Sequence, residues 1–417
     1  MEVKLRYKQT EVGGTPKEWE VKRMGDVATF YKGKGLPKSA LSESGAEPCI
    51  HYGELFTRYP ETIREIFSRT DASEAVFRSV ANDVLMPTSD VTPRGLAKAS
   101  CVIVDGVILG GDILVIRSDT NRVHGPFLSL VIRYEETQVL QLVTGSTVYH
   151  LYGSDMKNFT FSMPPLPEQT AIATALSDVD GLLGGLDRLI AKKRDLKQAA
   201  MQQLLTGQTR LPDFHGEWEV KRLGDVGSTY GGLTGKTKAD FGEGPARYIT
   251  FMNVMANVVI DCETFEPVQV SPTEAQNRAI KGDLFFNGSS ETPEEVAMCS
   301  VLLDEVQGVY LNSFCFGFRF HHDAEADGLF LAYYLRSKEG RELMKSLAQG
   351  STRYNLSKVA LLKSPLRLPR LLEQTAIASV LTEMDAELAA LTQRREKTRA
   401  LKQAMMQELL TGRTRLV

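Results

Sequence analysis

Residues 168–180 read EQTAIATALSDVD, and residues 196–211 read LKQAAMQQLLTGQTRL. Both runs return later in the chain, as EQTAIASVLTEMD at 373–385 and LKQAMMQELLTGRTRL at 401–416. The stretches that they delimit, 168–211 and 373–416, align without a gap, which indicates an internal duplication. This duplicated stretch decides the fold, and the rest of the chain is interpreted around it.

Each copy is predicted to form one long helix. Its apolar residues recur at alternating steps of four and three, which is the a/d pattern of a coiled coil. Gly207 and Gly412 stand where a C′ glycine would end each helix, and about 40 residues at 1.5 Å each give a length of roughly 60 Å. Each helix could pack on its own domain alone, but the similarity of the copies favours mutual pairing. The residues expected to pack between the two helices are Ile172, Leu176, Val179, Leu183, Leu186, Ile190, Ile377, Leu381, Met384, Leu388 and Leu391.

The repeat extends beyond these helices. Trp19 begins WEVKRMGDV, and Trp218 begins WEVKRLGDV. The run KQTEVGGTPKEW near the beginning of the chain also resembles TGQTRLPDFHGEW, which follows the first predicted helix. The chain is therefore a unit of about 200 residues used twice, in a pseudo-circular arrangement in which the beginning of the chain resembles what should follow the last helix.

The segments between the repeated stretches share only a skeleton. Each has a glycine-rich loop, a strand followed by a polar loop (NDVLMPTSDVTP against GDLFFNGSSETP), and a turn reading TGST or QGST. Strand-like runs such as GDILVIR and FCFGFRF predominate, with short helices at PFLSLVIRYEE and LFLAYYLRSKEGRELMKSLA. The predicted fold is α+β, with two mixed α/β globules, each followed by a long helix, and the two helices are expected to pair as a coiled coil. The predicted segments are a first globule at 1–165, a helix at 166–208, a second globule at 209–369 and a helix at 370–417.

Composition is that of a soluble globular protein with two or more domains. The chain has 417 residues, of which 42% are hydrophobic and 24% charged, and no apolar run reaches the length of a membrane span. The five cysteines are scattered without CxxC spacing, which favours reduced thiols in the cytoplasm and no zinc site. The formal net charge of −3 means that any surface for nucleic acid must be locally positive or completed by a partner.

Motifs of catalysis are missing from the sequence. The run GGLTGKT at 231–237 resembles a P-loop, but Tyr230 stands where the first glycine is required. No GxGxxG follows a strand, and neither the Asn-Pro-Pro-aromatic motif of amino-methyltransferases nor a nuclease-like acidic cluster is present. His321 and His322 have no third ligand motif nearby, so a loop after a strand is the better interpretation than a metal site. We expect no catalytic residues and no metal.

The residue types that remain suit contact with DNA. Polar loops follow equivalent predicted strands in the two halves, and their side chains can bind base edges, while lysines near the glycine-rich loops can bind phosphate. Ordinary turn chemistry is the alternative for each of these residues. The candidates are Lys34, Lys38, Thr88, Ser89, Thr92, Arg94, Lys98, Ser146, Thr147 and Tyr149 in the first half, and Lys236, Lys238, Asn287, Ser289, Ser290, Thr292, Ser351, Thr352, Arg353 and Tyr354 in the second.

The duplicated helices, the two WEVKR leaders and the TGST and QGST turns together resemble the specificity subunit of Type I restriction–modification enzymes. The resemblance spans almost the whole chain, although the second copy reads PRLLEQ and lacks a proline where Pro167 stands in the first. It implies that each globule is a target recognition domain for one half of a bipartite asymmetric DNA site. It also implies that the two helices form an antiparallel coiled coil with pseudo-two-fold symmetry. These helices would set the spacer between the halves and dock partner subunits.

The partners that the resemblance implies are double-stranded DNA, two modification (methyltransferase) subunits and restriction (translocase–nuclease) subunits. S-adenosylmethionine would be bound by the methyltransferase subunits, so this chain is expected to be a non-catalytic cytoplasmic subunit without a cofactor of its own. Two alternatives are a fused enzyme that itself methylates or cleaves DNA and a coiled-coil scaffold without DNA binding. About 200 residues per repeat leave little room for a catalytic domain beside globule and helix, which favours the non-catalytic subunit.

Overall fold

The computed structural model describes residues 7–72 and 76–416. The first six residues of the predicted segment 1–165, and Val417 of the last segment, lie outside this range. Contacts divide the chain into two compact units, which we call unit 1 (Met1–Asp187 with Gln393–Val417) and unit 2 (Arg188–Thr392). Each unit combines one globule with half of each long helix, so the units cut across the four predicted segments.

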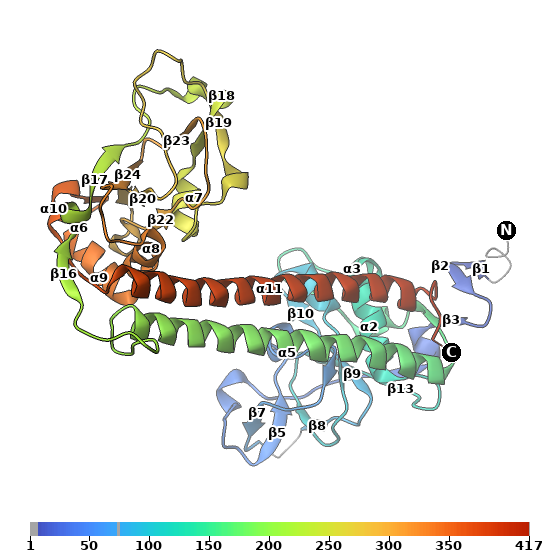
Figure 1. Cartoon of the computed structure of the whole chain (residues 1–417). Helices are drawn as coiled ribbons and strands as arrows, with labels where there is room; N and C mark the ends of the chain where they lie inside the picture. The colour runs from blue at the N-terminus through green and yellow to red at the C-terminus, as the bar shows by residue number, and fades with distance from the viewer. Residues whose placement is uncertain (1–6, 73–75, 417) are drawn as a thin grey trace. The chain divides into compact units, whose positions relative to one another are not determined.

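Both predicted long helices are present and continuous. They are α5 (Leu166–Leu204) and α11 (Leu371–Leu410), drawn in green and red in Figure 1. Gly207 and Gly412 follow their ends with φ of 73° and 70°, a left-handed conformation that glycine adopts without steric cost. The Gly207 N–H donates to the Leu204 carbonyl at 3.4 Å, and the Gly412 N–H to the Leu409 carbonyl at 3.3 Å. The predicted glycine helix ends are confirmed.

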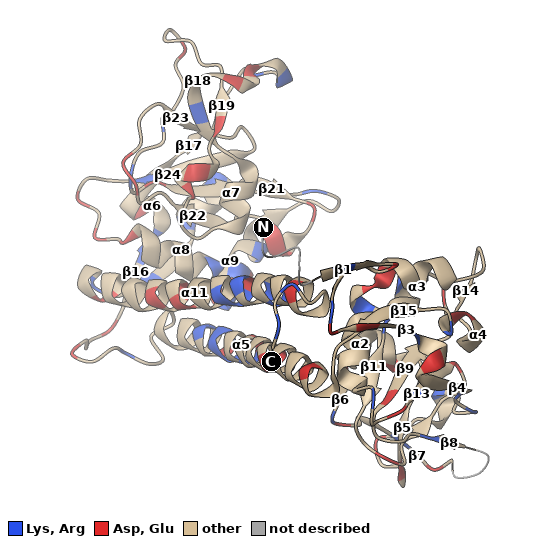
Figure 2. Cartoon of the chain, turned by 90° about the vertical axis from the view of Figure 1, so that its right-hand side faces the viewer, with Lys and Arg blue, Asp and Glu red and all other residues tan. Residues whose placement is uncertain are grey.

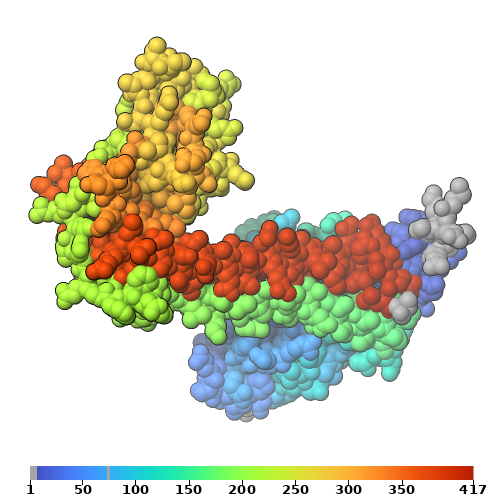
Figure 3. All heavy atoms as spheres, in the orientation of Figure 1, coloured from blue at the N-terminus to red at the C-terminus, as the bar shows by residue number. Residues whose placement is uncertain are grey.

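Ion pairs within unit 1 establish that α5 and α11 run antiparallel. Asp180 lies 2.6 Å from Lys402, and Asp187 lies 3.3 Å from Arg395. One heptad forward along α5 therefore corresponds to one heptad backward along α11. Figure 3 shows the atoms of the two helices lying against each other.

Unit 2 contains equivalent pairs between the other halves of the same helices. Lys197 of α5 pairs with Asp385 of α11, and Lys193 lies 2.7 Å from Glu387. Lys197 and Asp385 are the residues that the duplication relates to Lys402 and Asp180. The predicted α+β fold with two repeated regions and packed antiparallel helices is confirmed.

The apolar residues predicted to lie between the helices are shielded from solvent to different degrees. Near the globules they join the globular cores, because Ile172 and Leu176 share a cluster with Leu409 and Leu410, and Ile377 shares one with Leu204. The predicted residues that are fully buried are Ile172, Leu176, Leu186, Ile190, Ile377 and Leu381, and those that are half-buried are Val179, Leu183, Met384, Leu388 and Leu391.

The globule of unit 1 has a central sheet in the strand order β4-β13-β9-β11-β6. Neighbours are antiparallel except β11 and β6. Its strands are β4 (Ala28–Lys32), β13 (Ile113–Ser118), β9 (Asp83–Pro87), β11 (Ser100–Val102) and β6 (Thr62–Ile63). Alternate residues face opposite sides of a strand, so Val84 and Met86 pack with helix α2 (Gly125–Tyr134), whereas Leu85 packs against a second sheet.

The remaining elements of unit 1 complete these layers. The second sheet has the order β7-β5-β12-β8, and two-stranded pairs join β1 to β2 and β15 to β3. Their bounds are β7 (Ser68–Thr70), β5 (Glu47–Ile50), β12 (Ile108–Leu109), β8 (Phe77–Arg78), β1 (Tyr7–Thr10), β2 (Gly13–Pro16), β3 (Glu20–Arg23) and β15 (Thr160–Met163), with helices α1 (Glu54–Thr57), α3 (Glu136–Leu142) and α4 (Gly153–Met156).

Unit 2 repeats this layering with different residues. Its central sheet has the order β17-β24-β20-β22, and Leu284 and Phe286 face a helical layer while Phe285 faces a separate apolar cluster. The elements are β17 (Gly227–Gly231), β24 (Cys315–Phe320), β20 (Leu284–Asn287), β22 (Cys299–Val301), β19 (Glu266–Val268), β18 (Phe241–Ile249), β23 (Val309–Leu311), β16 (Glu219–Arg222), β27 (Pro365–Leu368), α6 (Leu223–Val226), α7 (Phe251–Ala256), α8 (Gly328–Arg336), α9 (Lys338–Leu347) and α10 (Lys358–Lys363). The run LFLAYYLRSKEGRELMKSLA, predicted as helical, forms the two helices α8 and α9.

The repeated glutamine of the EQTAIA run anchors each long helix to its own globule. The Gln169 amide donates to the carbonyls of Arg122 and Pro164, both at 2.9 Å, and accepts from the His124 N–H at 2.9 Å. Gln374 makes the equivalent three bonds in unit 2. Both side chains are fully buried, so this residue fixes the direction in which the helix leaves the globule.

The preceding glutamate closes each unit onto a distant part of the chain. In unit 1 the Glu168 carboxylate accepts from the Trp19 indole N–H at 3.0 Å and is paired with Arg415. In unit 2 Glu373 is paired with Arg210 in the same way. The TRL run at the end of each repeat therefore returns to the start of the other helix, as the predicted pseudo-circular arrangement requires.

Candidate nucleic-acid interface

The loops predicted to contact DNA gather at one edge of the central sheet of unit 1. Because neighbouring strands are antiparallel, β4 and β9 end at this edge and β13 begins there. After β9 the chain forms β10 (Ser89–Asp90), which pairs with β14 (Tyr149–His150). The Thr88 N–H donates to the Asp112 carbonyl and the Leu151 N–H to the Thr88 carbonyl, both at 3.0 Å. Two loops that the sequence analysis treated separately thus form one ribbon on the sheet.

The same arrangement recurs in unit 2. After β20 the chain forms β21 (Ser289–Ser290), which pairs with β26 (Tyr354–Leu356), and β26 pairs in turn with β25 (Ala348–Gln349). The Gly288 N–H donates to the Phe314 carbonyl at 2.9 Å and the Leu356 N–H to the Gly288 carbonyl at 3.0 Å. A two-stranded β-ribbon is one of the elements that the major groove of B-DNA admits.

Glycine is required in the turn before each ribbon strand. Gly145 has φ of 109° and Gly350 has φ of 124°, values that side-chain-bearing residues rarely adopt. A Cβ atom would lie 2.2 Å from the carbonyl oxygen of Val148 in the first turn and 2.2 Å from that of Arg353 in the second. The TGST and QGST sequences therefore encode the same tight turn twice.

In unit 1 the ribbon borders a groove of about 1010 Å³. Its lining includes Tyr31, Thr88, Ser89, His150 and Tyr152, so aromatic rings and hydroxyl groups face the same space. The rings of His150 and Tyr152 are stacked, with centroids 6.1 Å apart. Flat rings and hydroxyls can respectively stack on bases and bind base edges.

Most of the other predicted residues of unit 1 lie on or beside this ribbon, whereas Lys34 and Lys38 lie in the segment that packs against the second sheet. The Thr92 hydroxyl donates to Asp90 at 2.8 Å. Arg94 lies 3.5 Å from Glu136, and both side chains are exposed, so this pair is weak and breaks readily. The remaining candidates are exposed except for half-buried Tyr149, and they are Lys34, Lys38, Lys98, Ser146, Thr147 and Tyr149.

In unit 2 the ribbon presents an arginine. The Arg353 Nε donates to the Ser289 hydroxyl at 3.1 Å, and its guanidinium carbon lies 6.0 Å from the Phe314 ring centroid. Ser290 donates to Glu295 at 3.3 Å. Thr292, Ser351 and Thr352 are exposed, and Tyr354 is half-buried.

Asn287 is buried and is not available to a base. Its amide donates to the carbonyls of Ser289 and Glu295 at 3.1 and 2.9 Å and accepts from the Met298 N–H at 2.6 Å. It therefore shapes the loop from inside, in contrast to the prediction that it contacts DNA.

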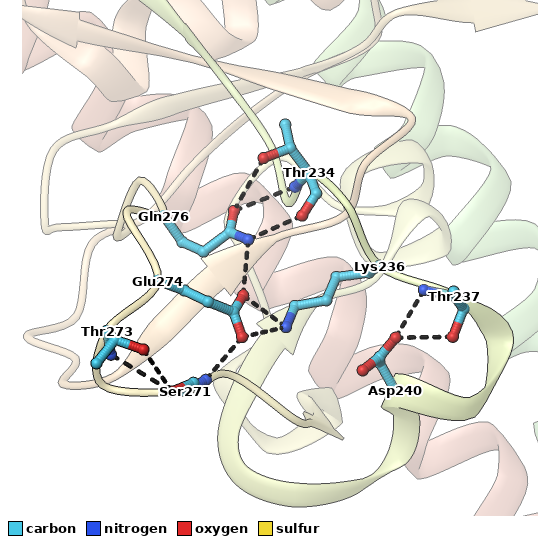
Figure 4. A network of polar contacts seen from close by, with 8 residues as sticks. All are labelled: Thr234, Lys236, Thr237, Asp240, Ser271, Thr273, Glu274 and Gln276. Carbon is cyan, nitrogen blue, oxygen red and sulfur yellow. Dashed lines mark hydrogen bonds and ion pairs between the residues drawn. The ribbon is translucent and has the colours of Figure 1, made fainter.

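Lys236 is also engaged within the chain. Figure 4 shows its ammonium group held by Glu274, with 2.6 Å between Nζ and Oε2, and the lysine side chain is only 5% exposed. The Lys236 ammonium and then the Ser271 N–H lower the pKa of Glu274 to about 2. The paired lysine stabilises the loop instead of offering a free charge to phosphate, whereas Lys238 is exposed.

Several residues at the two sheet edges were missed because they are apolar. In unit 1, Val91 is 72% exposed, Val148 43% and Tyr152 54%, and in unit 2 Phe314 is 61% exposed. The predicted binding residues all have polar side chains, whereas Phe314 belongs to the strand-like run FCFGFRF. The position of Phe314, directly before β24, is the signal in the sequence that could have indicated its exposure.

Positive charge gathers on the long helices. Each helix is acidic in its first part and then carries a basic stretch, at 188–197 in α5 and 394–402 in α11 (Figure 2). In the described part of the chain, no helix combines the length and apolarity needed to cross a bilayer. Within residues 7–72 and 76–416, no three His, Cys, Asp or Glu side chains are grouped as metal ligands.

Comparison with known proteins agrees with this repeated architecture. The model of the family described as "Type I restriction modification DNA specificity domain" matches residues 16–190 and 215–399. The chain is 24% identical over 414 residues to the Type I restriction enzyme MjaVIII specificity subunit of Methanocaldococcus jannaschii, covering 96% of this chain and 94% of that protein. It is 22% identical over 443 residues to the putative type I restriction enzyme MjaX specificity subunit of the same organism, covering 98% and 97%.

Solved structures share the fold. The Type-I restriction-modification system S subunit from M. genitalium matches with a TM-score of 0.59 at 16% identity, over 94% of this chain and 96% of that one. The HsdS subunit from Thermoanaerobacter tengcongensis matches with a TM-score of 0.52 at 18% identity, over 97% and 100%. The two family matches fall on the two repeats. The chain thus belongs to the Type I restriction modification DNA specificity domain family, and its function is to recognise a DNA sequence for a Type I restriction–modification system.

Proposed function

We propose that each unit recognises one half of a bipartite, asymmetric DNA site through its ribbon at the sheet edge. The observation that carries this proposal is the pairing of β10 with β14 and of β21 with β26 at equivalent edges, with different side chains on each. Equal scaffolds with unequal side chains suit two different half-sites. In this proposal, residues 1–165 and 209–369 are the two target recognition domains.

The two long helices act as a spacer of fixed length between the half-sites. Support comes from the matched ion pairs within each unit, because Asp180–Lys402 and Asp385–Lys197 hold the helices in one register. Inserting one heptad after Leu189 together with one after Arg394 should lengthen the gap between half-sites and leave both half-site sequences unchanged. An unchanged gap in a folded variant would refute the spacer role.

The partners in this proposal are double-stranded DNA, two modification (methyltransferase) subunits that dock on the helices, and restriction (translocase–nuclease) subunits. S-adenosylmethionine is bound by the modification subunits, and this chain carries out no chemistry itself. All five cysteines are free thiols, in keeping with a reducing cytoplasm. The isolated chain should transfer no methyl group from S-adenosylmethionine to DNA; transfer without a partner would favour a fused enzyme.

The decisive experiment is an exchange of recognition domains. Residues 30–165 are replaced by the corresponding segment of another specificity subunit, and the methylated sites of the assembled complex are determined by sequencing. We expect one half-site to change while the other half-site and the gap remain. A matched exchange of residues 230–369 should change the other half only. Changes in both halves from either exchange would contradict the division of labour, and folded complexes without any sequence preference would contradict DNA recognition.

A further inference from the structure

Arg353 is held in a defined position on the ribbon of unit 2, although it is exposed. Its Nε donates to the Ser289 hydroxyl at 3.1 Å, and Ser289 is 8% exposed on β21. The Phe314 ring lies 6.0 Å from the guanidinium carbon, within the range of a cation–π contact. Neither terminal nitrogen of this guanidinium bonds to a residue within 7–72 or 76–416. Two parallel N–H donors are therefore presented to solvent.

The backbone of Phe314 and the turn that leads to Arg353 are themselves fixed. The Phe314 N–H donates to the Asn312 side chain at 2.9 Å, and its carbonyl accepts from the Gly288 N–H at 2.9 Å. On the other side, Gly350 lacks the Cβ that would lie 2.2 Å from the Arg353 carbonyl. The Phe314 ring is 61% exposed and lies 6.0 Å from the guanidinium carbon, so a ligand that reached the terminal nitrogens of Arg353 would also cover this ring.

Local charge favours a base edge over a phosphate as that ligand. The chain after β21 carries Glu291, Glu294 and Glu295. Glu295 contacts the Ser290 hydroxyl at 3.3 Å, whereas Glu294 is paired with Lys345 at 3.1 Å. Carboxylates repel the phosphate backbone, whereas the guanine edge in the major groove offers the two acceptors O6 and N7 to a forked donor. The arginine fork and this edge match in number and direction of hydrogen bonds.

We propose that Arg353 recognises a guanine in the half-site contacted by unit 2, with Ser289 and Phe314 as positioning residues. This proposal rests on the proposed function of the unit as a recognition domain. The equivalent position of unit 1 is Val148, which donates no hydrogen bond, and Asp112 stands where unit 2 has Phe314. The two units therefore present different side chains at this position. In this proposal, only unit 2 recognises a guanine there.

The test uses the chain assembled with its modification subunits. Arg353→Val, which introduces the residue of unit 1, is compared with Arg367→Val, an exposed arginine on β27 in a separate sheet. Binding to DNA sites with each base pair of the half-site changed in turn is measured at two salt concentrations. Arg353→Val should lose roughly 5- to 150-fold discrimination at one guanine, because a bidentate pair contributes that much specificity. Arg367→Val should discriminate like the wild type.

Further variants separate this role from a structural one. Arg353→Lys keeps the charge but loses the fork, so it should relax the same guanine with an unchanged salt dependence. Phe314→Leu should relax it more weakly. Equal weakening on all sequences would assign Arg353 to a phosphate and overturn the proposal, as would unchanged discrimination or relaxation at a base other than guanine. A wild-type complex without any sequence preference would instead contradict the proposed function itself.

Discussion

The buried glutamate at the start of each long helix should contribute unequally to the stability of the two units. Glu168 accepts from the Trp19 indole at 3.0 Å and is paired with Arg415. The corresponding Glu373 is paired with Arg210 only, and the buried indole N–H of Trp218 has no hydrogen-bond partner. Glu168→Gln should therefore destabilise unit 1 more than Glu373→Gln destabilises unit 2.

The expected difference follows from one additional hydrogen bond. Both carboxylates are almost fully buried, with side-chain exposures of 2%, so solvent does not replace the lost contacts. A hydrogen bond to a charged acceptor contributes about 1.5–3 kcal/mol, and a glutamine oxygen retains part of it. We expect the free energy of unfolding of unit 1 to fall by about 1–2 kcal/mol more than that of unit 2.

The sequence supplies a reporter for each unit, because its only two tryptophans are Trp19 and Trp218. Trp218→Phe leaves unit 1 fluorescent, and Trp19→Phe leaves unit 2 fluorescent. Glu168→Gln is measured in the first background and Glu373→Gln in the second, by denaturant unfolding with a separate midpoint for each indole. Trp218→Phe removes an unsatisfied N–H and should itself cost little. Equal losses in the two units, or a larger loss in unit 2, would refute the assigned contacts.

Three other perturbations have defined outcomes. Gly350→Ala should destabilise unit 2 by about 1–3 kcal/mol, because a Cβ is strained at this φ and meets a backbone oxygen. The unfolding midpoint reported by Trp218 measures this loss, and an unchanged midpoint would contradict the strained turn. Lys402→Met should destabilise unit 1 by about 1–2 kcal/mol, because Asp180, at 2.6 Å, loses this ion pair, while Glu61, at 3.2 Å from Lys402, keeps Arg133 at 3.6 Å; a stabilised unit 1 would show that the cation is dispensable. Burial raises the pKa of Cys49 to about 11, so its alkylation near neutral pH should be roughly a hundredfold slower than in unfolded chain, as mass spectrometry of the labelled peptide can show.

Local and repeated features of the fold were predictable from the sequence. The two copies of the a/d pattern predicted α5 and α11, and their glycines predicted the helix ends. Mutual pairing of the helices followed from the duplication, because a chain that repeats one helix offers each copy a partner of matching pattern, whereas their antiparallel direction was implied by the family resemblance. The position of Gln169, by contrast, indicated only a helix N-terminus. Two of its three bond partners, Arg122 and His124, lie more than 40 residues away in the chain, a separation at which no periodic pattern carries information.

The candidate interface was predictable in outline but not residue by residue. The polar loops after equivalent strands were located correctly at the sheet edges, but Asn287 and Lys236 use their polar atoms inside the loops. Phe314 was missed because the sequence does not show whether an aromatic side chain at the start of a strand is buried or exposed. Its tertiary contacts decide this. Residue type thus indicates what a side chain can bind, whereas tertiary contacts decide whether its donors remain free.

The division of the chain into units has a consequence for biosynthesis. Unit 2 is one uninterrupted segment, but unit 1 needs its first 187 residues and the last 25, Gln393–Val417. Leu409 and Leu410 complete the apolar cluster that contains Phe127 and Ile172. On the ribosome, unit 1 is therefore begun before unit 2 and completed after it, and until the final turns of α11 have emerged its nascent surface needs protection from aggregation.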